Sequence, residues 1–157
     1  MKIVVVSDSH GRNDILNLIR EKHPEARLFI HCGDLEDDPM NYPGYIIVRG
    51  NNDYFGLGRF EDQRIIPIGK HRIFVTHSHR FSYFSRCEQL ANRAKELDCD
   101  IVCFGHTHVA YFDQVDGVVL LNPGSLSHSR DGKPCSYAVL DIDENHVSVD
   151  FKFEPEW

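Results

Sequence analysis

The sequence predicts an α/β fold in which two mixed β-sheets pack as a sandwich flanked by helices. Strand-sized apolar segments alternate with helical segments in the first third of the chain, and strand pairs joined by tight turns dominate the rest. The 157 residues suffice for a hydrophobic core, and they include no repeat, low-complexity tract or linker. We therefore expect a single domain over residues 1–157.

The first part of the chain reads as a β-α-β unit followed by a further strand. Residues 2–7 form a continuous run of mostly β-branched apolar residues, which is typical of a strand covered on both faces. Asn13 is placed to cap a helix that ends near His23. Residues 27–31 and 45–49 follow as strands. This order favours a parallel sheet.

The remaining elements are hairpins, one helix and one buried strand. Residues 87–97 place Leu90, Ala91, Ala94 and Leu97 on one helical face, and residues 100–104 read as a buried strand. Tight-turn residues such as Asp116-Gly117 separate the strand pairs. The predicted hairpins pair residues 63–68 with 72–76, 111–115 with 118–121, and 136–142 with 146–153.

Charge and hydropathy narrow the classes of function. The formal net charge of −7 argues against a broad basic surface for nucleic acid, although it leaves room for a nucleotide-sized substrate at a metal site. No apolar run approaches the ~20 residues that a membrane helix needs. The chain enters its first strand without a signal-peptide pattern, so we expect a cytoplasmic protein that does not bind membranes.

The cysteines do not suggest a disulfide scaffold or a thiolate zinc site. Their number is odd, and no two of them form a C-x-x-C pair. We expect reduced, mostly buried residues at Cys32, Cys87, Cys99, Cys103 and Cys135. The ten histidines are more informative.

Polar residues with metal-ligand chemistry follow the predicted strands at the point where each strand ends. Strand ends are where open α/β sheets bind ligands, and carboxylate, amide and imidazole groups suit divalent transition ions. Glycines at positions 33, 50 and 105 permit sharp exits from the strands. Each block alone is a weak signal, but five in this order predict one site. The blocks are Asp8-Ser9-His10, Gly33-Asp34, Gly50-Asn51-Asn52-Asp53, His77-Ser78-His79 and Gly105-His106-Thr107-His108.

These five blocks resemble the calcineurin-like metallophosphoesterase superfamily, whose pattern is D-x-H, G-D, G-N-[HCN]-[DE], a histidine block and G-H-[TS]-H. The loop from Asn122 to Ser125 also resembles one found in the small branch described as YfcE-like phosphodiesterases. The resemblance implies that Asp8, His10 and His108 hold one metal ion and that Asn51, His77 and His106 hold another, with Asp34 bridging the two.

The resemblance further implies a phosphoesterase, most directly a phosphodiesterase, in which a metal-bridging hydroxide attacks a small phosphodiester. Two divalent ions carry four positive charges, and Asp8 and Asp34 cancel only two, so the site retains charge for the anionic substrate. Mn is our first expectation for the metal, and Ni, Co, Fe, Zn and Mg suit the same ligands. Besides Asp34 and Asn51, we count His79 among the catalytic candidates.

One position departs from the pattern of many relatives. Asn52 stands where they carry a histidine that is thought to protonate the leaving group or clamp the phosphate. The departure of a poor alkoxide therefore lacks that assistance, and the small phosphodiesterase branch commonly lacks this histidine too. Block four has Ser78 where glycine is usual, but its ligand position is filled.

Several other residues have two readings. His79 either contacts the phosphate or supports His77, Asp53 is read as an acceptor that orients a ligand, and Arg130 as a phosphate contact or an ordinary exposed arginine. Asn13 is read as a helix cap before a phosphate contact. Packing is the first reading for His31, Cys32, Tyr54 and Phe55, with stacking on an aromatic leaving group as the alternative for the last two.

Two alternatives to the phosphodiesterase remain. One is a protein-interaction scaffold like the retromer small subunit, which shares this fold and is regarded as having a degenerate site. All seven ligand positions are filled here, which favours the enzyme. The other is a phosphomonoesterase, which Asn52 and the short chain make less favourable. The edge strands leave a homodimer open.

Overall fold

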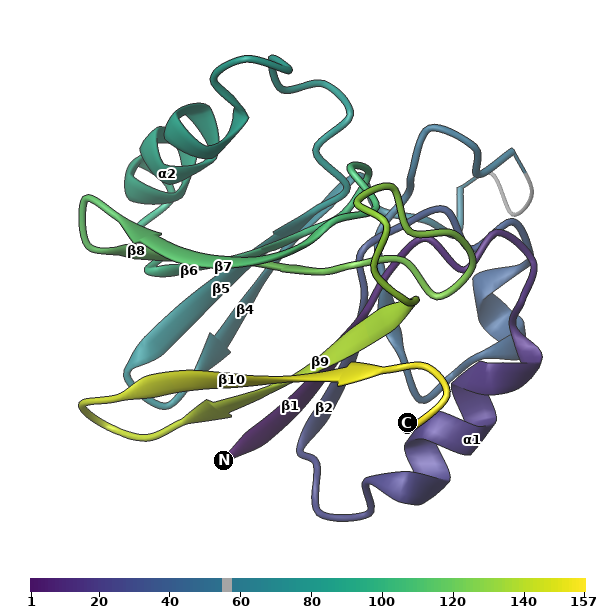
Figure 1. Ribbon diagram of the computed structural model, residues 1–157. Helices are drawn as coiled ribbons and strands as arrows, with labels where there is room; N and C mark the ends of the chain where they lie inside the picture. The colour runs from purple at the N-terminus through teal and green to yellow at the C-terminus, as the bar shows by residue number, and fades with distance from the viewer. Residues whose placement is uncertain (55–57) are drawn as a thin grey trace.

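The computed structural model describes residues 1–54 and 58–157, and it consists of two five-stranded sheets packed face to face (Figure 1). Helix α1 (Asp14–Lys22) packs on the outer face of the first sheet, and helix α2 (Arg86–Glu96) packs on the outer face of the second. A short 3-10 helix, η1 (Pro39–Asn41), follows the second strand. The fold class predicted from the sequence is confirmed.

The first sheet brings the two ends of the chain together in the order β10-β9-β1-β2-β3. The three N-terminal strands run parallel, as the β-α-β order predicts, whereas β9 is antiparallel to both of its neighbours. β1 therefore lies at the centre, next to β9 from the other end of the chain. The strands are β1 (Lys2–Val6), β2 (Leu28–His31), β3 (Ile46–Ile47), β9 (Ser136–Ile142) and β10 (Val147–Phe153).

The second sheet has the order β4-β5-β6-β8-β7. Its central strands β5, β6 and β8 are parallel, and the hairpins β4–β5 and β7–β8 close its edges. All three hairpins predicted from the sequence are confirmed, β9–β10 included. The strands are β4 (Gln63–Ile68), β5 (His71–Thr76), β6 (Ile101–Phe104), β7 (Ala110–Val115) and β8 (Val118–Pro123).

Alternate residues of the central strands pack into different layers of the core. Ile3 and Val5 of β1 belong to the cluster between the sheets, while Val4 and Val6 belong to the cluster under α1. This explains why β1 is apolar without interruption. Under α2 the expected helical face is buried at Leu90, Ala91 and Ala94, and Leu97 is only partly buried where the helix ends.

Two expectations need correction. The third strand was predicted over residues 45–49, but β3 covers only Ile46–Ile47; the Val48 N–H still donates to the His31 carbonyl of β2, while Val48 itself pairs with Glu61 in an isolated bridge. Asn13 occupies the first position before α1, yet its side chain makes no capping hydrogen bond. Its amide donates instead to the Leu35 carbonyl and accepts from the Ser9 hydroxyl, so its contacts are with the loops of the site.

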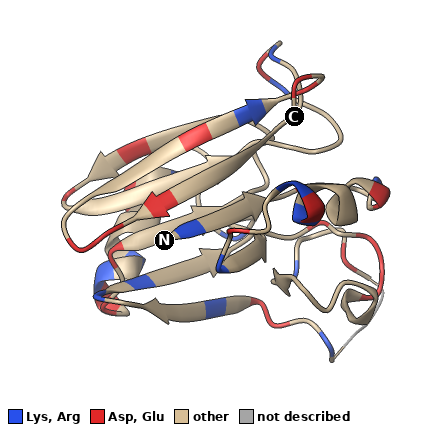
Figure 2. Ribbon diagram, turned by 90° about the horizontal axis from the view of Figure 1, so that it is seen from below, with Lys and Arg blue, Asp and Glu red and all other residues tan. Residues whose placement is uncertain are grey.

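Lys and Arg residues are scattered among Asp and Glu residues on the face that Figure 2 shows. Within the described residues, no helix is both long enough and apolar enough to cross a membrane. All five cysteines are free, and Cys32, Cys99 and Cys103 are buried.

Candidate metal centre

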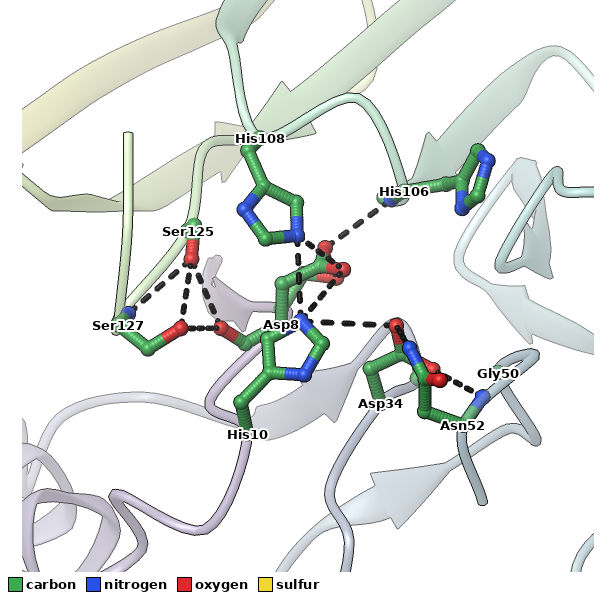
Figure 3. Close-up of polar contacts among 12 residues, drawn as sticks. Asp8, His10, Asp34, Gly50, Asn52, His106, His108, Ser125 and Ser127 are labelled. Carbon is green, nitrogen blue, oxygen red and sulfur yellow. Dashed lines mark hydrogen bonds and ion pairs between the residues drawn. The ribbon is translucent and has the colours of Figure 1, made fainter. Parts of the chain in front are cut away.

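The predicted ligands come from loops that follow β1, β2, β3, β5 and β6. Because the carboxyl ends of parallel strands point to one edge, the loops of both sheets meet there. Figure 3 shows Asp8, His10, Asp34 and His108 pointing toward one another, with His106 to the right of His108. The structure thus brings together blocks that are up to 100 residues apart, 8 to 108, in the sequence.

Two groups of side chains have donor atoms spaced for a metal ion. In each group the donor atoms all lie within 4.8 Å of one another. The first group is Asp8, His10 and His108, and the second is Asp8, Asp34 and His77.

Both aspartates lie close to histidines of both groups. Asp34 Oδ2 is 3.6 Å from His10 Nε2 and 3.3 Å from His77 Nε2, so its carboxylate reaches histidines of both groups. Asp8 Oδ1 is 3.2 Å from His108 Nε2 and 3.8 Å from each of the other two Nε2 atoms. The family resemblance implied Asp34 as the shared ligand; in the structure, Asp8 is the aspartate that belongs to both groups.

Asn51 connects the remaining predicted ligands. Its Oδ1 lies 3.0 Å from His77 Nε2 and 3.1 Å from His106 Nδ1. An amide oxygen with two imidazole nitrogens at this distance forms a third set of potential ligands beside the buried carboxylates. All seven residues predicted to bind metal are therefore gathered at one place.

Three histidines are held so that Nε2 faces the site. His77 Nδ1 donates to the Cys32 carbonyl at 2.8 Å, His108 Nδ1 donates to the His128 carbonyl at 2.6 Å, and His10 Nδ1 contacts Glu36 Oε1 at 3.0 Å. In a neutral imidazole, a proton on Nδ1 leaves a lone pair on Nε2. Such an acceptor behind a metal-binding histidine fixes its tautomer and orientation.

This arrangement fits a cation. His10 Nε2 and His108 Nε2 face each other at 3.2 Å, and two lone pairs at that distance repel unless a positive charge lies near both. Asp8 Oδ1 is buried and has no hydrogen-bond partner among the described residues, while Oδ2 accepts from Ser7 and from the His106 backbone. A metal ion bound here would satisfy the unpaired carboxylate oxygen and both nitrogens at once.

The pKa shifts of Asp8, Asp34 and His77 also indicate a site suited to positive charge. Burial raises the pKa of Asp34, but the nearby His77 imidazole and the hydrogen bonds from Asn52 outweigh it and hold the pKa well below its usual range. Burial likewise opposes ionisation of Asp8, whose pKa is nevertheless lowered by His108 and His77. Burial lowers the pKa of His77, yet Asp34 and Asp8 bring it above its ordinary value. Two buried carboxylates that stay ionised would favour the binding of a cation.

The backbone of these loops is strained. Among the described residues other than glycine, most of those with positive φ lie at the site, whereas Asp98 and Asp116 are elsewhere. A left-handed conformation costs on the order of 1 kcal/mol or more for such residues and persists where surrounding contacts impose it. The residues at the site are Asp8 (φ 52°), His10 (45°), Asp34 (60°), Glu36 (60°), Ser78 (80°), His106 (74°) and His108 (61°).

The glycines of the motifs have two different roles. Gly33 adopts φ 106°, which agrees with the expected sharp exit from the strand. Gly50 and Gly105 are not among the residues with positive φ, so the same explanation is wrong for them. A Cβ atom at Gly50 would collide with Asp34, and one at Gly105 would collide with the Ser7 hydroxyl beside Asp8. These glycines make room for the carboxylates.

Asp53 fixes the backbone around Asp34. Its carboxylate accepts hydrogen bonds from the backbone N–H groups of Asp34 (2.8 Å), Glu36 (2.8 Å) and Gly50 (2.6 Å). Burial raises its pKa, with these bonds opposing the rise. Asp53 therefore orients a ligand, as its sequence position suggested, through the backbone that carries Asp34 and Glu36.

His31 carries a hydrogen-bond chain that the sequence did not suggest. Its Nδ1 accepts from the Gly33 N–H at 3.1 Å, so the proton resides on Nε2, which donates to the Ser9 hydroxyl at 2.9 Å. Ser9 in turn donates to Asn13 at 2.6 Å. His31 is fully buried, and burial lowers its pKa to about 4. The chain connects the Asp8–His10 loop to the Gly33–Asp34 loop.

Other residues missed by the sequence reasoning are Glu36, Ser127 and the carbonyl groups behind His77 and His108. Ser127 and Ser125 both donate to the Asp8 carbonyl, at 2.9 and 2.8 Å (Figure 3). Glu36 follows the Gly33-Asp34 block by two positions, and this spacing was its only signal. The others contact the site through hydroxyl or backbone groups that no motif marks.

Asn52 and His79 lie beside the centre. The Asn52 backbone N–H donates to Asp34 Oδ1 at 2.9 Å, and its side-chain amide donates to Oδ2 at 3.1 Å. His79 has its ring centroid 5.5 Å from that of His77 and 6.3 Å from that of His106. Its Nδ1 is buried without a hydrogen-bond partner in the part of the chain that the structure describes.

Arg130 and Tyr54 are further from the donor atoms. Arg130 is exposed and donates to the His106 carbonyl at 3.3 Å, which places its guanidinium at the rim. Tyr54 is 73% exposed, so its ring does not pack in the core, which was part of its first reading as a core or rim residue. Phe55 lies outside the described residues.

Two mixed sheets with convergent ligand atoms at their strand ends define a metallophosphoesterase fold. The profile of the calcineurin-like phosphoesterase superfamily domain matches residues 1–145, and the chain belongs to this superfamily. The probable metallophosphoesterase YsnB of Bacillus subtilis is 36% identical over 155 residues, which cover 96% of this chain and 90% of YsnB. Phosphodiesterase YfcE of Escherichia coli is 36% identical over an alignment 172 positions long, which covers 91% of this chain and 89% of YfcE.

Solved structures of other proteins share this fold. A Streptococcus pneumoniae protein described as a predicted phosphoesterase has a TM-score of 0.89 and 31% identity, covering 97% of this chain and 88% of its own. Vps29 of Entamoeba histolytica, solved with zinc, has a TM-score of 0.74 and 23% identity, covering 98% of this chain and 99% of its own. The likeness to Vps29 shows a shared fold and favours no particular function.

Proposed function

We propose that this protein is a metal-dependent phosphodiesterase that hydrolyses small phosphodiesters at a dinuclear centre. The observation that carries the proposal is the set of three histidines whose Nε2 atoms converge on the unpaired buried oxygen of Asp8. Two divalent ions, with Mn²⁺ as our first choice, would supply a hydroxide nucleophile at neutral pH and offset the charge of the phosphate. A relative named as a phosphodiesterase supports the choice of substrate.

Each predicted ligand has a role consistent with its contacts. Asp8, His10 and His108 would hold one ion, and Asn51, His77 and His106 the other. Asp34 would bridge them, since its Oδ2 lies near His10 and His77. Burial, with His77 nearby, lowers the pKa of His106 to about 4, which keeps its imidazole neutral for an ion.

The remaining residues would handle the substrate. His79 lies next to His77 and His106 and is only partly buried, which would let its imidazole contact a phosphate oxygen or a leaving group. Asn52 donates to Asp34 and carries no group that titrates, so it holds Asp34 without supplying a proton. Esters whose leaving groups depart without protonation are then the better substrates.

A matrix of metals and substrates on metal-stripped protein tests the proposal. Bis-p-nitrophenyl phosphate and p-nitrophenyl phosphate share a leaving group, so their rate ratio reports the preference for diester over monoester. We expect no hydrolysis without metal, recovery with Mn²⁺ or a similar ion, and a higher kcat/KM for the diester. Full activity after verified removal of metal would refute the mechanism.

The same matrix separates the alternatives. A phosphomonoesterase would prefer the monoester with every metal. A protein-interaction scaffold would hydrolyse neither ester with any metal, even when calorimetry shows that ions bind. The complete set of seven ligands favours the enzyme over the scaffold.

A further inference from the structure

A pocket of about 680 Å³ lies directly beside the candidate metal centre. His106 and Thr107 line it, so the pocket and the centre share the loop after β6. Figure 1 shows the chain between β5 and α2 rising above the second sheet before it returns as α2, and the start of that helix forms the opposite wall. The volume is within the range of pockets that hold small ligands.

The pocket is rich in aromatic groups. Phe104, which is buried, and Tyr111 form an edge-to-face pair with centroids 6.5 Å apart on the side of the sheet. Tyr83 and Phe84 stand on the other side as a second edge-to-face pair at 5.3 Å, and they are 80% and 94% exposed. Two adjacent rings this exposed are unusual unless a ligand or partner covers them.

The charged groups at this pocket favour an anion. Arg86 and Arg130 line it against a single acidic residue, Glu88, in a chain whose formal net charge is −7. Arg130 donates to the His106 carbonyl, which holds its guanidinium at the border between the pocket and the metal centre. An anionic phosphate at the centre would have a guanidinium on its pocket side.

We infer that this pocket binds an aromatic ester arm of the phosphodiester, such as an aryl ring or a nucleobase, while the phosphate occupies the metal centre. The inference rests on the proposed function, since it assigns the substrate class of that site. Tyr83 and Phe84 would cover the ring, and Phe104 and Tyr111 would form its floor. Tyr54, which the sequence suggested as a stacking residue, does not line the pocket.

Phenylphosphonate and methylphosphonate test the inference, because they differ only in the arm. Their Kd values for Mn²⁺-loaded protein are measured by calorimetry, which requires no turnover. We expect phenylphosphonate to bind about tenfold more tightly, equivalent to ~1.4 kcal/mol. The double variant Tyr83→Ala/Phe84→Ala should reduce this ratio to about twofold. Both side chains are exposed, so circular dichroism should show an intact fold.

Tyr54→Ala is the matched control, because it removes a similarly exposed ring that does not line the pocket, so the tenfold ratio should be kept. A ratio near one in the parent protein, an unchanged ratio in the double variant, or a loss of the ratio in Tyr54→Ala would overturn the inference. If the ratio is present but no diester is hydrolysed with any metal, the proposed function fails while the pocket assignment stands. If diesters are hydrolysed but the ratio of the two Kd values is near one, the pocket assignment fails while the proposed function stands.

Discussion

Glu36 offers a sharp test of the metal centre, because it contacts a predicted ligand without being one. Its carboxylate lies 3.0 Å from His10 Nδ1, and its side chain is 35% exposed. Loss of an acceptor behind a ligand histidine typically weakens metal binding ten- to a hundredfold. Water can partly replace an acceptor this exposed, so we expect the lower end for Glu36→Ala, about tenfold or ~1.4 kcal/mol.

Glu36→Gln refines the test. The glutamine keeps an oxygen that can accept from Nδ1 but removes the charge, so we expect a smaller loss, of about threefold. Both variants keep the strained backbone at residue 36 as it is, since neither introduces glycine. The assay is calorimetric titration of metal-stripped protein with Mn²⁺, together with urea unfolding without metal, in which we expect changes within about 0.5 kcal/mol.

The chain contains a matched control for this contact. Glu25 Oε1 lies 3.2 Å from His23 Nδ1, an exposed pair that includes none of the predicted metal ligands. Glu25→Ala should leave Mn²⁺ binding unchanged. If Glu36→Ala binds Mn²⁺ within twofold of the parent, or if Glu25→Ala loses as much affinity, then Glu36 does not hold a metal-binding His10.

Three further predictions concern the bridge, the leaving group and the buried histidine. Asp34→Asn should lower kcat/KM by orders of magnitude with the fold retained; parent-like turnover with two bound ions would contradict the bridging role. Asn52→His should flatten the dependence of kcat/KM on leaving-group pKa across substituted phenyl diesters and raise the monoester-to-diester ratio; an unchanged slope and ratio would exclude control by this position. The pKa of His31 is about 4 in the folded protein and about 6.5 in the unfolded chain. Between these values the unfolded chain binds a proton at His31 that the folded protein does not. The free energy of unfolding should therefore fall by roughly 3 kcal/mol from pH 6.5 to pH 4. Urea unfolding of metal-free His31→Gln should show a correspondingly weaker pH dependence than the parent, and equal slopes would refute this account.

The sequence predicted the elements of the fold because their signals are local. An uninterrupted β-branched run marks β1 as a strand buried on two faces, and the turn at Asp116-Gly117 marks the β7–β8 hairpin. β3 was predicted too long, since Tyr45 and Val48 are apolar like strand residues but are not paired with β2 residues in the register of the sheet. Strand length at a sheet edge depends on the neighbouring strand, and no local pattern records that.

For the candidate metal centre too, some features follow from the sequence and others only from the tertiary structure. The sequence by itself determined which ligand types occur and that they follow strand ends, and parallel strands then bring Asp8 and His106 to one edge. Only the tertiary structure decided which atoms face the centre. The direction of His10, His77 and His108 depends on acceptors at Glu36, Cys32 and His128, two of which are backbone carbonyls without a sequence signature. The role of Asn13 also changed, because Ser9 and Leu35 from two different loops compete for an amide that would otherwise cap a helix. Hydrogen bonds between loops distant in the chain set these orientations, and they exist only once both sheets have packed.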